Sequence, residues 1–218
     1  MNPVVIVLAI IVIILIYVLY RYFTKPMALT TKMIRLNVDN PPIPGTSITN
    51  PTSTRYSYGV WAYINTWTPN QKILITRGSD STAEFSLYLD PSQPVLYCIV
   101  GGQSSIFVTD NFPIQKWVYI IISVDNQFVD CYLDGKLVKS QKLNTQPSTN
   151  SSTLPITFGK GSDIYISNVT RWTQPMDPAT AWSNYMDGNG GTSNFLSSYN
   201  LDLTLLKDNV TKSKYTLF

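Results

Sequence analysis

The chain has 218 residues, with 16 Lys and Arg against 13 Asp and Glu, and it contains no histidine. The missing histidine excludes Ser-His-Asp triads and histidine-containing zinc sites, and a single glutamate, Glu84, excludes a pair of catalytic glutamates. The net charge of +3 is small and is concentrated near the N-terminus, so we expect no nucleic-acid partner.

Residues 1–23 are predicted to form a transmembrane anchor. The run from Pro3 to Tyr20 carries no charge and is almost wholly apolar, and a helix of this length covers about 27 Å, close to the hydrocarbon thickness of a bilayer. The alternative is a cleaved signal peptide, which requires a basic stretch before the apolar run and small residues after it. The sequence has neither. The apolar anchor positions are Val4, Ile6, Leu8, Ile11, Ile14, Leu15 and Leu19.

A basic flank follows the apolar run and precedes the first acid, Asp39. By the positive-inside rule, this asymmetry predicts that the C-terminal domain faces the cytosol or a compartment equivalent to it. A polybasic segment beside a membrane also suits an anionic leaflet. The alternative is that these charges only stop translocation. The juxtamembrane basic residues are Arg21, Lys25, Lys32 and Arg35.

Residues 24–55 are predicted to be a linker, because five prolines interrupt helix and favour extended chain. Within this linker, the segment from Lys32 to Val38 alternates apolar and polar residues. Such alternation indicates one candidate first strand.

From residue 56 onward, short runs rich in Val, Ile, Tyr, Phe, Trp and Thr are separated by turn residues. Asp134-Gly135 lies between two alternating runs and predicts a hairpin. A single short helix is predicted over Pro178–Met186, with Asp177 as its N-cap. The closely spaced strands favour an antiparallel sandwich. They are predicted over Tyr58–Ile64, Ile73–Arg77, Ala83–Leu89, Val95–Val100, Ile106–Thr109, Trp117–Val124, Phe128–Leu133, Lys136–Lys142, Leu154–Phe158 and Asp163–Arg171.

The run Trp117–Val124, followed by Val129–Val138 with its Tyr-x-Asp-Gly hairpin, resembles the signature of laminin-G-like, concanavalin-A-like jelly rolls. Other stretches agree with that family in their order: 58–64, 73–78 and 164–172. The resemblance covers about residues 56–188 and implies an all-β antiparallel jelly-roll sandwich. It does not specify a function, since this fold carries lectins, glycosidases, adhesion modules and structural domains.

Residues 189–218 follow a glycine-rich break and are predicted to form an appended hairpin. Leu201, Leu203 and Leu205 alternate with other residues, and residues 213–218 could pair back after a turn at Asp208-Asn209. A free tail is the alternative.

The acidic residues do not form a recognisable catalytic or metal-binding set. Glycosidases use two acidic residues placed close together on one strand, but no acid follows Glu84 at the second or fourth position after it. Asp130 and Asp134 are interpreted as an exposed strand residue and a turn former. Asp80 and Asp110 match no calcium ligand set, so we expect no metal, no cofactor and no enzymatic activity.

The expected state of the cysteines and of the glycosylation sequons depends on the cellular compartment that the domain faces. Cys98 and Cys131 lie on predicted strands and are expected to be free thiols on the cytosolic side, with a disulfide as the alternative. The sequons at Asn150, Asn168 and Asn209 matter only if the domain enters a lumen.

Three tryptophans, Trp67, Trp172 and Trp182, lie near strand ends or in loops. Exposed Trp is favoured at interfaces, so these residues are candidates for contact with a protein partner or a sugar. Each has an equally good interpretation as a core residue.

The preferred hypothesis is a non-enzymatic structural protein. A Tyr-flanked N-terminal anchor before a laminin-G-like domain resembles the membrane-anchored minor capsid proteins of large nucleocytoplasmic DNA viruses. This resemblance implies that the chain lies in the virion inner membrane and contacts coat or capsid proteins. The alternative is an outward-facing lectin or adhesin that binds glycans, and a glycosidase is a remote third hypothesis.

Overall fold

The computed structural model describes residues 3–23, 26–78, 83–103, 105–147, 151–189, 202–207 and 210–216. Lys25, Asn150 and Asn209, to which the sequence assigned roles, lie outside these residues. For Val4, Ile6 and Arg21 the structure describes the backbone alone.

The described residues form three helices and fourteen strands. The helices are α1 (Pro3–Phe23), the 3-10 helix η1 (Gly45–Ser47) and α2 (Pro178–Met186). The strands are β1 (Met27–Thr30), β2 (Ile34–Arg35), β3 (Arg55–Ile64), β4 (Lys72–Arg77), β5 (Phe85–Leu89), β6 (Leu96–Val100), β7 (Ile106–Thr109), β8 (Trp117–Asp125), β9 (Phe128–Leu133), β10 (Lys136–Lys142), β11 (Ile156–Phe158), β12 (Ile164–Trp172), β13 (Asp202–Lys207) and β14 (Val210–Thr216).

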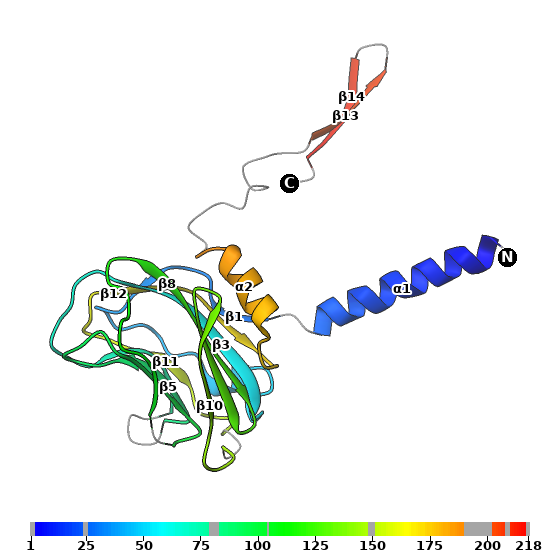
Figure 1. The fold of residues 1–218 in the computed structure, drawn as a ribbon. Coiled ribbons are helices and arrows are strands. Elements are labelled where there is room, and N and C mark those ends of the chain that lie inside the picture. The colour runs from blue at the N-terminus through cyan, green and yellow to red at the C-terminus, as the bar shows by residue number, and fades with distance from the viewer. Residues whose placement is uncertain are drawn as a thin grey trace.

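Two antiparallel sheets pack face to face (Figure 1). Within the described residues, the larger sheet has seven strands in the order β1-β12-β3-β8-β9-β10, with β2 also paired to β12. The smaller sheet has the order β11-β4-β5-β6-β7. The predicted all-β antiparallel sandwich is therefore confirmed.

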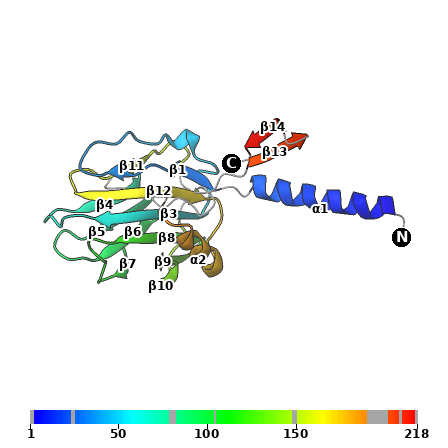
Figure 2. The same ribbon diagram turned by 90° about the horizontal axis from the view of Figure 1, so that it is seen from above.

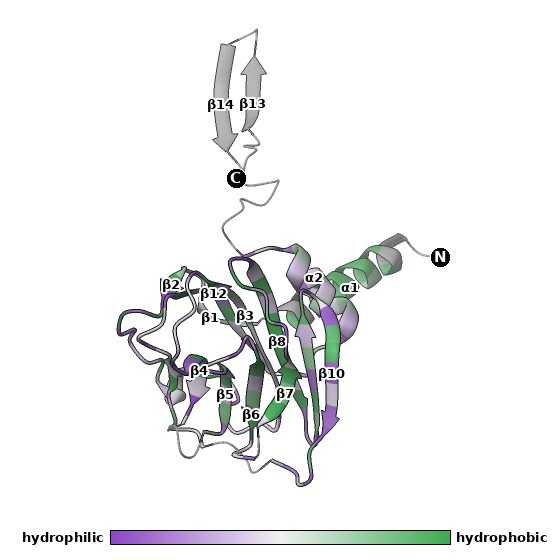
Figure 3. Ribbon diagram, turned by 60° about the vertical axis from the view of Figure 1, so that its left-hand side comes forward, coloured by the Kyte–Doolittle hydropathy of each residue, from purple (hydrophilic) through white to green (hydrophobic). Residues whose placement is uncertain are grey.

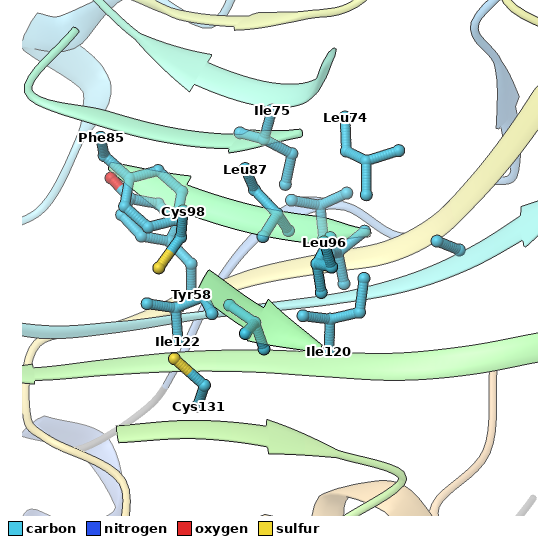
Figure 4. Packing of buried hydrophobic residues seen from close by; sticks show 14 of the residues in the cluster. Tyr58, Leu74, Ile75, Phe85, Leu87, Leu96, Cys98, Ile120, Ile122 and Cys131 are labelled. Atoms are coloured by element: carbon cyan, nitrogen blue, oxygen red, sulfur yellow. The ribbon is translucent and has the colours of Figure 1, made fainter. Parts of the chain in front are cut away.

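The core lies between the two sheets, because alternate residues of each strand face this space. Tyr58 of β3 stacks on Phe85 of β5, with ring centroids 4.4 Å apart (Figure 4). Cys98 and Cys131 lie on opposite sheets with their sulfur atoms inside this core, and both are free and buried. A hydrogen bond with Cys131 and burial both raise the pKa of the Cys98 thiol, so Cys98 stays protonated.

The helix predicted over residues 178–186 is confirmed with the same bounds. Asp177 caps it, because one carboxylate oxygen accepts the backbone N–H groups of Ala179 and Thr180. Pro178 occupies the first helical position, where its missing N–H costs nothing. The helix α2 covers part of the outer face of the larger sheet, and its residue Ala181 is completely buried there.

The segment predicted as a linker is partly folded onto the sandwich, which corrects that prediction. β1 pairs with β12 at Met27 and Arg171, and β2 pairs with the same strand. Leu36 and Ile48 lie in the core. The predicted strand is only Ile34–Arg35 long, and β1 was missed. The reason is that the partner strand is more than 120 residues away in sequence, so no local pattern reveals the pairing.

The helix α1 extends away from the sandwich in two perpendicular views (Figures 1 and 2). Its described residues are strongly apolar (Figure 3). Within the part of the chain that the structure describes, no helix is both long enough and apolar enough to cross a membrane, so the predicted span is not confirmed.

The C-terminal strands β13 and β14 pair antiparallel, in the form of the predicted hairpin. The pairing runs from Asp202 opposite Thr216 to Lys207 opposite Val210. The second strand therefore begins three residues earlier than the predicted start at residue 213.

Candidate functional site

A row of aromatic side chains crosses the outer face of the larger sheet. Strand register places Tyr165 of β12 opposite Tyr63 of β3, and Tyr63 opposite Trp117 of β8. The alternate residues of β3 and β8 line the core, so these three side chains lie on the opposite face. We call Tyr165, Tyr63 and Trp117 the aromatic row. Arg35 of β2 extends it by one strand, because Arg35 pairs with Tyr165.

The rings of the aromatic row contact one another and remain partly accessible. The centroids of Tyr63 and Trp117 are 5.5 Å apart, and those of Tyr63 and Tyr165 are 6.3 Å apart. The Arg35 guanidinium lies 5.3 Å from the centre of the Tyr165 ring. All three rings are half-buried. The row is thus a preformed surface that a ligand can contact without first ordering its side chains.

Arg35 is held in place by the carboxylate of Asp163. Arg35 Nε and Nη2 donate to Asp163 Oδ1 at 3.1 and 2.7 Å. Asn65 and Thr66 donate to the other oxygen, Oδ2, at 2.6 and 3.0 Å. These hydrogen bonds from Asn65 and Arg35 lower the pKa of Asp163. Arg35, predicted as part of a basic membrane flank, therefore lies in an ion pair on the sheet, whereas Lys32 is exposed.

Protonation of Asp163 should remove this support in acid. Because the folded-state pKa lies below the ordinary value of 3.8, the unfolded chain takes up the proton first as the pH falls. The stabilisation is therefore present above about pH 4 and is lost progressively below it. We expect urea unfolding of the wild type to show a steeper acid loss than unfolding of Asp163→Asn. Asp110→Asn, at an exposed loop position, should follow the wild type, and equal slopes in all three chains would contradict the expectation.

Beyond the row, α2 and the segment before it cover the outer face. Trp61 stacks between Tyr119 at 4.9 Å and Tyr185 of α2 at 5.6 Å. The Tyr132 hydroxyl donates to the Met176 carbonyl at 3.1 Å. Burial raises the pKa of Tyr119, and it raises the pKa of Tyr132 to about 12. These aromatics are therefore structural, and Trp117 of the aromatic row packs against the edge of their cluster.

A small hollow of about 160 Å³ lies where the C-terminal end of α2 meets the sheet. Trp61, Trp172, Thr170, Asn184 and Asp187 contribute to its walls. The indole N–H of Trp61 is buried and has no hydrogen-bond partner among the described residues. A buried donor without a partner is rare in folded proteins.

The smaller sheet carries a second aromatic row on its own outer face. Tyr88 pairs with Tyr97, and Tyr97 pairs with Phe107. Tyr88 and Tyr97 stack at 5.6 Å, and Phe107 meets Tyr97 edge-on at 6.0 Å. No guanidinium lies over these rings among the described residues. The row on the larger sheet is therefore distinguished by its fixed charge.

The structure places the predicted interaction tryptophans in different environments. Trp67 packs against the core, and the Lys72 ammonium lies 3.8 Å above its ring. Trp172 is half-buried beside Gly59, where an added Cβ atom would lie 2.8 Å from its ring. Trp182 is 45% exposed on α2. Sequence reasoning missed the aromatic row because its members come from strands that are distant in sequence, and only the strand register brings them side by side. The only local signal for the row was an aromatic residue at alternate positions of a strand.

The acidic residues have structural roles. Glu84 Oε1 accepts the backbone N–H of Ser151 at 2.7 Å, and Oε2 lies 4.0 Å from Arg77 Nε. Asp134 accepts the backbone N–H of Tyr119 at 2.9 Å. Among the described residues, no three His, Cys, Asp or Glu side chains come together in a way that could hold a metal ion. The absence of catalysis and of a metal remains a prediction.

The sequon residue Asn168 lies at a bulge in β12, with a positive φ of 48°. Its side chain is half-buried and donates to the Gly188 carbonyl at 3.4 Å. A glycan at this position would have to displace that contact. Asn168 is therefore a poorer acceptor than its sequence motif indicates.

Residues 40–188 match a laminin-G-like family model described as the concanavalin A-like lectin/glucanases superfamily. The match covers more than half of the chain and includes its central jelly roll. This protein therefore belongs to that superfamily, as the laminin-G-like resemblance predicted. The matched region begins inside the segment predicted as a linker, in agreement with the burial of Ile48.

Solved structures with a similar fold include two proteins that act on or bind other molecules. Trypanosoma rangeli sialidase aligns with 12% identity and a TM-score of 0.52 over 63% of this chain and 24% of its own. The receptor binding domain of botulinum neurotoxin D aligns with 14% identity and a TM-score of 0.53 over 74% of this chain and 43% of its own. The chain thus spans less than half of either protein, and these identities show the fold alone. A comparison with curated proteins found no match.

Proposed function

We propose that this protein is a non-enzymatic, membrane-attached binding protein, in which α1 is the anchor and the sandwich binds another macromolecule. The observation that carries the proposal is the exposure of α1. Its large apolar side chains from Val5 to Leu19, wherever the structure describes them, are between 46% and 66% exposed. A helix that is apolar on all sides needs either a protein core or lipid around it. The sandwich supplies no such cover, because α1 extends away from it (Figure 2).

The aromatic row supports binding by the sandwich. Tyr, Trp and Arg are the side chains that most often dominate the binding energy of protein interfaces, and here Arg35, Tyr165, Tyr63 and Trp117 are adjacent. We therefore propose a protein partner. The specific form that the sequence suggested, a minor capsid protein that tethers an inner membrane to a capsid shell, is one such arrangement. It places the sandwich on the cytosol-equivalent side of the membrane.

Glycan binding is the second candidate. Half-buried aromatic rings can also stack on sugar rings, and one similar structure is a sialidase solved in complex with sialic acid. The fold is compatible with both kinds of partner. The second candidate requires the opposite topology, with the sandwich outside the cytosol.

Topology separates the two candidates. The full chain is translated with microsomes, and the membranes are floated on a density gradient and then treated with protease. We expect the chain to float, the sandwich to be digested, and Asn150 and Asn209 to carry no glycan. A protected and glycosylated sandwich would favour the glycan-binding candidate, and a chain that does not float would refute the anchor.

The binding surface is tested with matched aromatic variants. Tyr63→Ser with Trp117→Ser alters the row beside Arg35, and Tyr88→Ser with Tyr97→Ser alters the row on the smaller sheet. Cross-linked complexes of the full chain with membrane-associated proteins should disappear in the first variant and persist in the second. Loss of binding to a glycan array in the first variant, without loss of protein complexes, would instead support the glycan-binding candidate.

A further inference from the structure

The helix α2 presents an uncharged surface with apolar side chains to solvent. Its nine residues include no acidic or basic side chain. Ala181 is buried and Tyr185 is half-buried against the sheet, so this side of the helix holds it in place. Trp182 and Met186 are 45% and 65% exposed. They are four residues apart and therefore neighbours on the same face of the helix.

The helix α2 lies on the side of the sandwich from which α1 emerges. Figures 1 and 2, which are perpendicular views, both show α2 on that side. A contact agrees with the views, because Pro26, three residues after the end of α1, lines the same hollow as Asn184 of α2. A membrane that holds α1 would therefore lie next to α2 rather than next to the smaller sheet.

We propose that Trp182 and Met186 enter the interfacial layer of the membrane that holds α1, so that α2 fixes the orientation of the sandwich on the membrane surface. The inference rests on the proposed membrane attachment of α1. Tryptophan is enriched at membrane interfaces, where its ring is partly buried and its N–H can reach polar groups. The absence of charge on α2 means that its partial burial requires no charged side chain to lose water.

Charged residues flank this face. Asp177 caps one end of α2, and the exposed Asp187 follows the other end. Asp134 and Lys136 are the chain neighbours of Gly135, where an added Cβ atom would lie 3.0 Å from Trp182. Three of these four residues carry carboxylates, which would be repelled by an anionic surface. The face therefore fits a zwitterionic lipid surface better than a strongly acidic one, and phosphatidylcholine is the appropriate probe.

The test uses the full chain in phosphatidylcholine vesicles with one environment-sensitive fluorophore at a time. The native Cys98 and Cys131 are fully buried, so they do not compete for the label in the folded chain. Three variants carry the labelling cysteine: Ile13→Cys on α1, Met186→Cys on α2 and Phe107→Cys on β7. Phe107 is 43% exposed on the smaller sheet and serves as the control. Lipids with a spin label on the headgroup or high on the acyl chain quench a fluorophore at the interface, and lipids with a spin label deep in the acyl chain quench one near the centre of the bilayer, where position 13 would lie.

We expect blue-shifted emission and lipid quenching at positions 13 and 186, and neither effect at position 107.

Quenching at 13 without quenching at 186 would overturn the inference and leave the anchor intact. No effect at 13 would refute the anchor, and with it the proposed attachment. A blue shift at 186 that spin-labelled lipid does not quench would show that protein, a second copy or another partner, covers α2, and would also overturn the inference. Equal quenching at 107 and 186 would show that the sandwich has no fixed orientation, which contradicts the role given to α2.

Discussion

Replacement of Arg171 with methionine should lower the free energy of unfolding by about 3 kcal/mol. Arg171 is fully buried, and its guanidinium donates to the carbonyls of Thr49 and Asn50. Methionine makes neither of these charge-assisted hydrogen bonds, and a hydrogen bond to a charged group contributes about 1.5–3 kcal/mol. The Asn50 carbonyl keeps the backbone N–H of Ser53 as a donor, whereas the Thr49 carbonyl loses the guanidinium. The loss of repulsion from the neighbouring Arg77, which is also buried, offsets only part of this cost.

The size of the expected loss in unfolding free energy follows from the contacts that Arg171 makes inside the sandwich. Its guanidinium lies 5.6 and 5.8 Å from the ring centres of Tyr56 and Tyr58. Burial lowers the pKa of Arg171, whereas the neighbouring Tyr58 and Tyr56 act in the opposite direction and favour the charged form. Arg77 donates in the same way to the carbonyls of Pro51 and Ser151, at 2.8 and 2.7 Å. The two arginines therefore hold irregular segments that have no strand partners.

Urea unfolding of the full chain in detergent, followed by tryptophan fluorescence, measures the effect. Arg171→Lys should recover little of the loss, since a single ammonium cannot replace the planar fork that reaches two carbonyls. Arg55→Met is the control. Arg55 pairs with Asp125 at the surface, where both side chains are about half exposed, so its loss should cost less than about 1 kcal/mol. A similar cost for Arg55→Met and Arg171→Met would contradict the role given to the buried guanidinium.

Two lysines in the middle of α1 should abolish membrane attachment. Ile11 and Ile14 are 52% and 56% exposed on a helix that lacks charge at every position from 3 to 20. A lysine near the centre of a membrane-embedded helix costs about 2.5–3.5 kcal/mol. The two costs together weaken partition into the bilayer by about four orders of magnitude.

Flotation of the full chain with phosphatidylcholine vesicles measures this partition. The Ile11→Lys, Ile14→Lys double variant should remain at the bottom of the gradient, and the Ile11→Leu, Ile14→Leu double variant should float as the wild type does. Near-ultraviolet circular dichroism should be unchanged in both, because neither residue contacts the sandwich core. Flotation of the lysine variant would show that the sandwich, and not α1, carries the attachment.

Local pattern predicted most of the strands well. β7, β9 and β10 have the predicted bounds, and β3, β4 and β8 differ by no more than three residues at either end. Most of these strands are short runs rich in β-branched and aromatic residues between turn residues, and this signal is visible in a short window of sequence. The helix α2 was equally predictable, because Asp177 and Pro178 form a local start signal.

The candidate binding surface was not predictable in the same way. The aromatic row joins residues from three strands, and its members are separated by up to 102 residues in sequence (63 to 165). The register of β8 places Trp117 on the outer face beside Tyr63. The tryptophans chosen from sequence, of which Trp67 is the clearest example, were selected by their position near loops, and position along the chain does not report burial.

The sequence by itself determined the class of the fold, the positions of most strands, the short helix and the unusual apolar run at the N-terminus. Each of these features depends on neighbours within a few residues. The tertiary structure alone decided which strands pair, which aromatics share a face and where the buried charges lie. In the tertiary structure, residues 27–48 lie against the sandwich. Arg35, which was expected to flank the membrane, forms an ion pair with Asp163. The physical reason is that pairing and burial are set by contacts between distant segments, and such contacts leave no local signal in the chain.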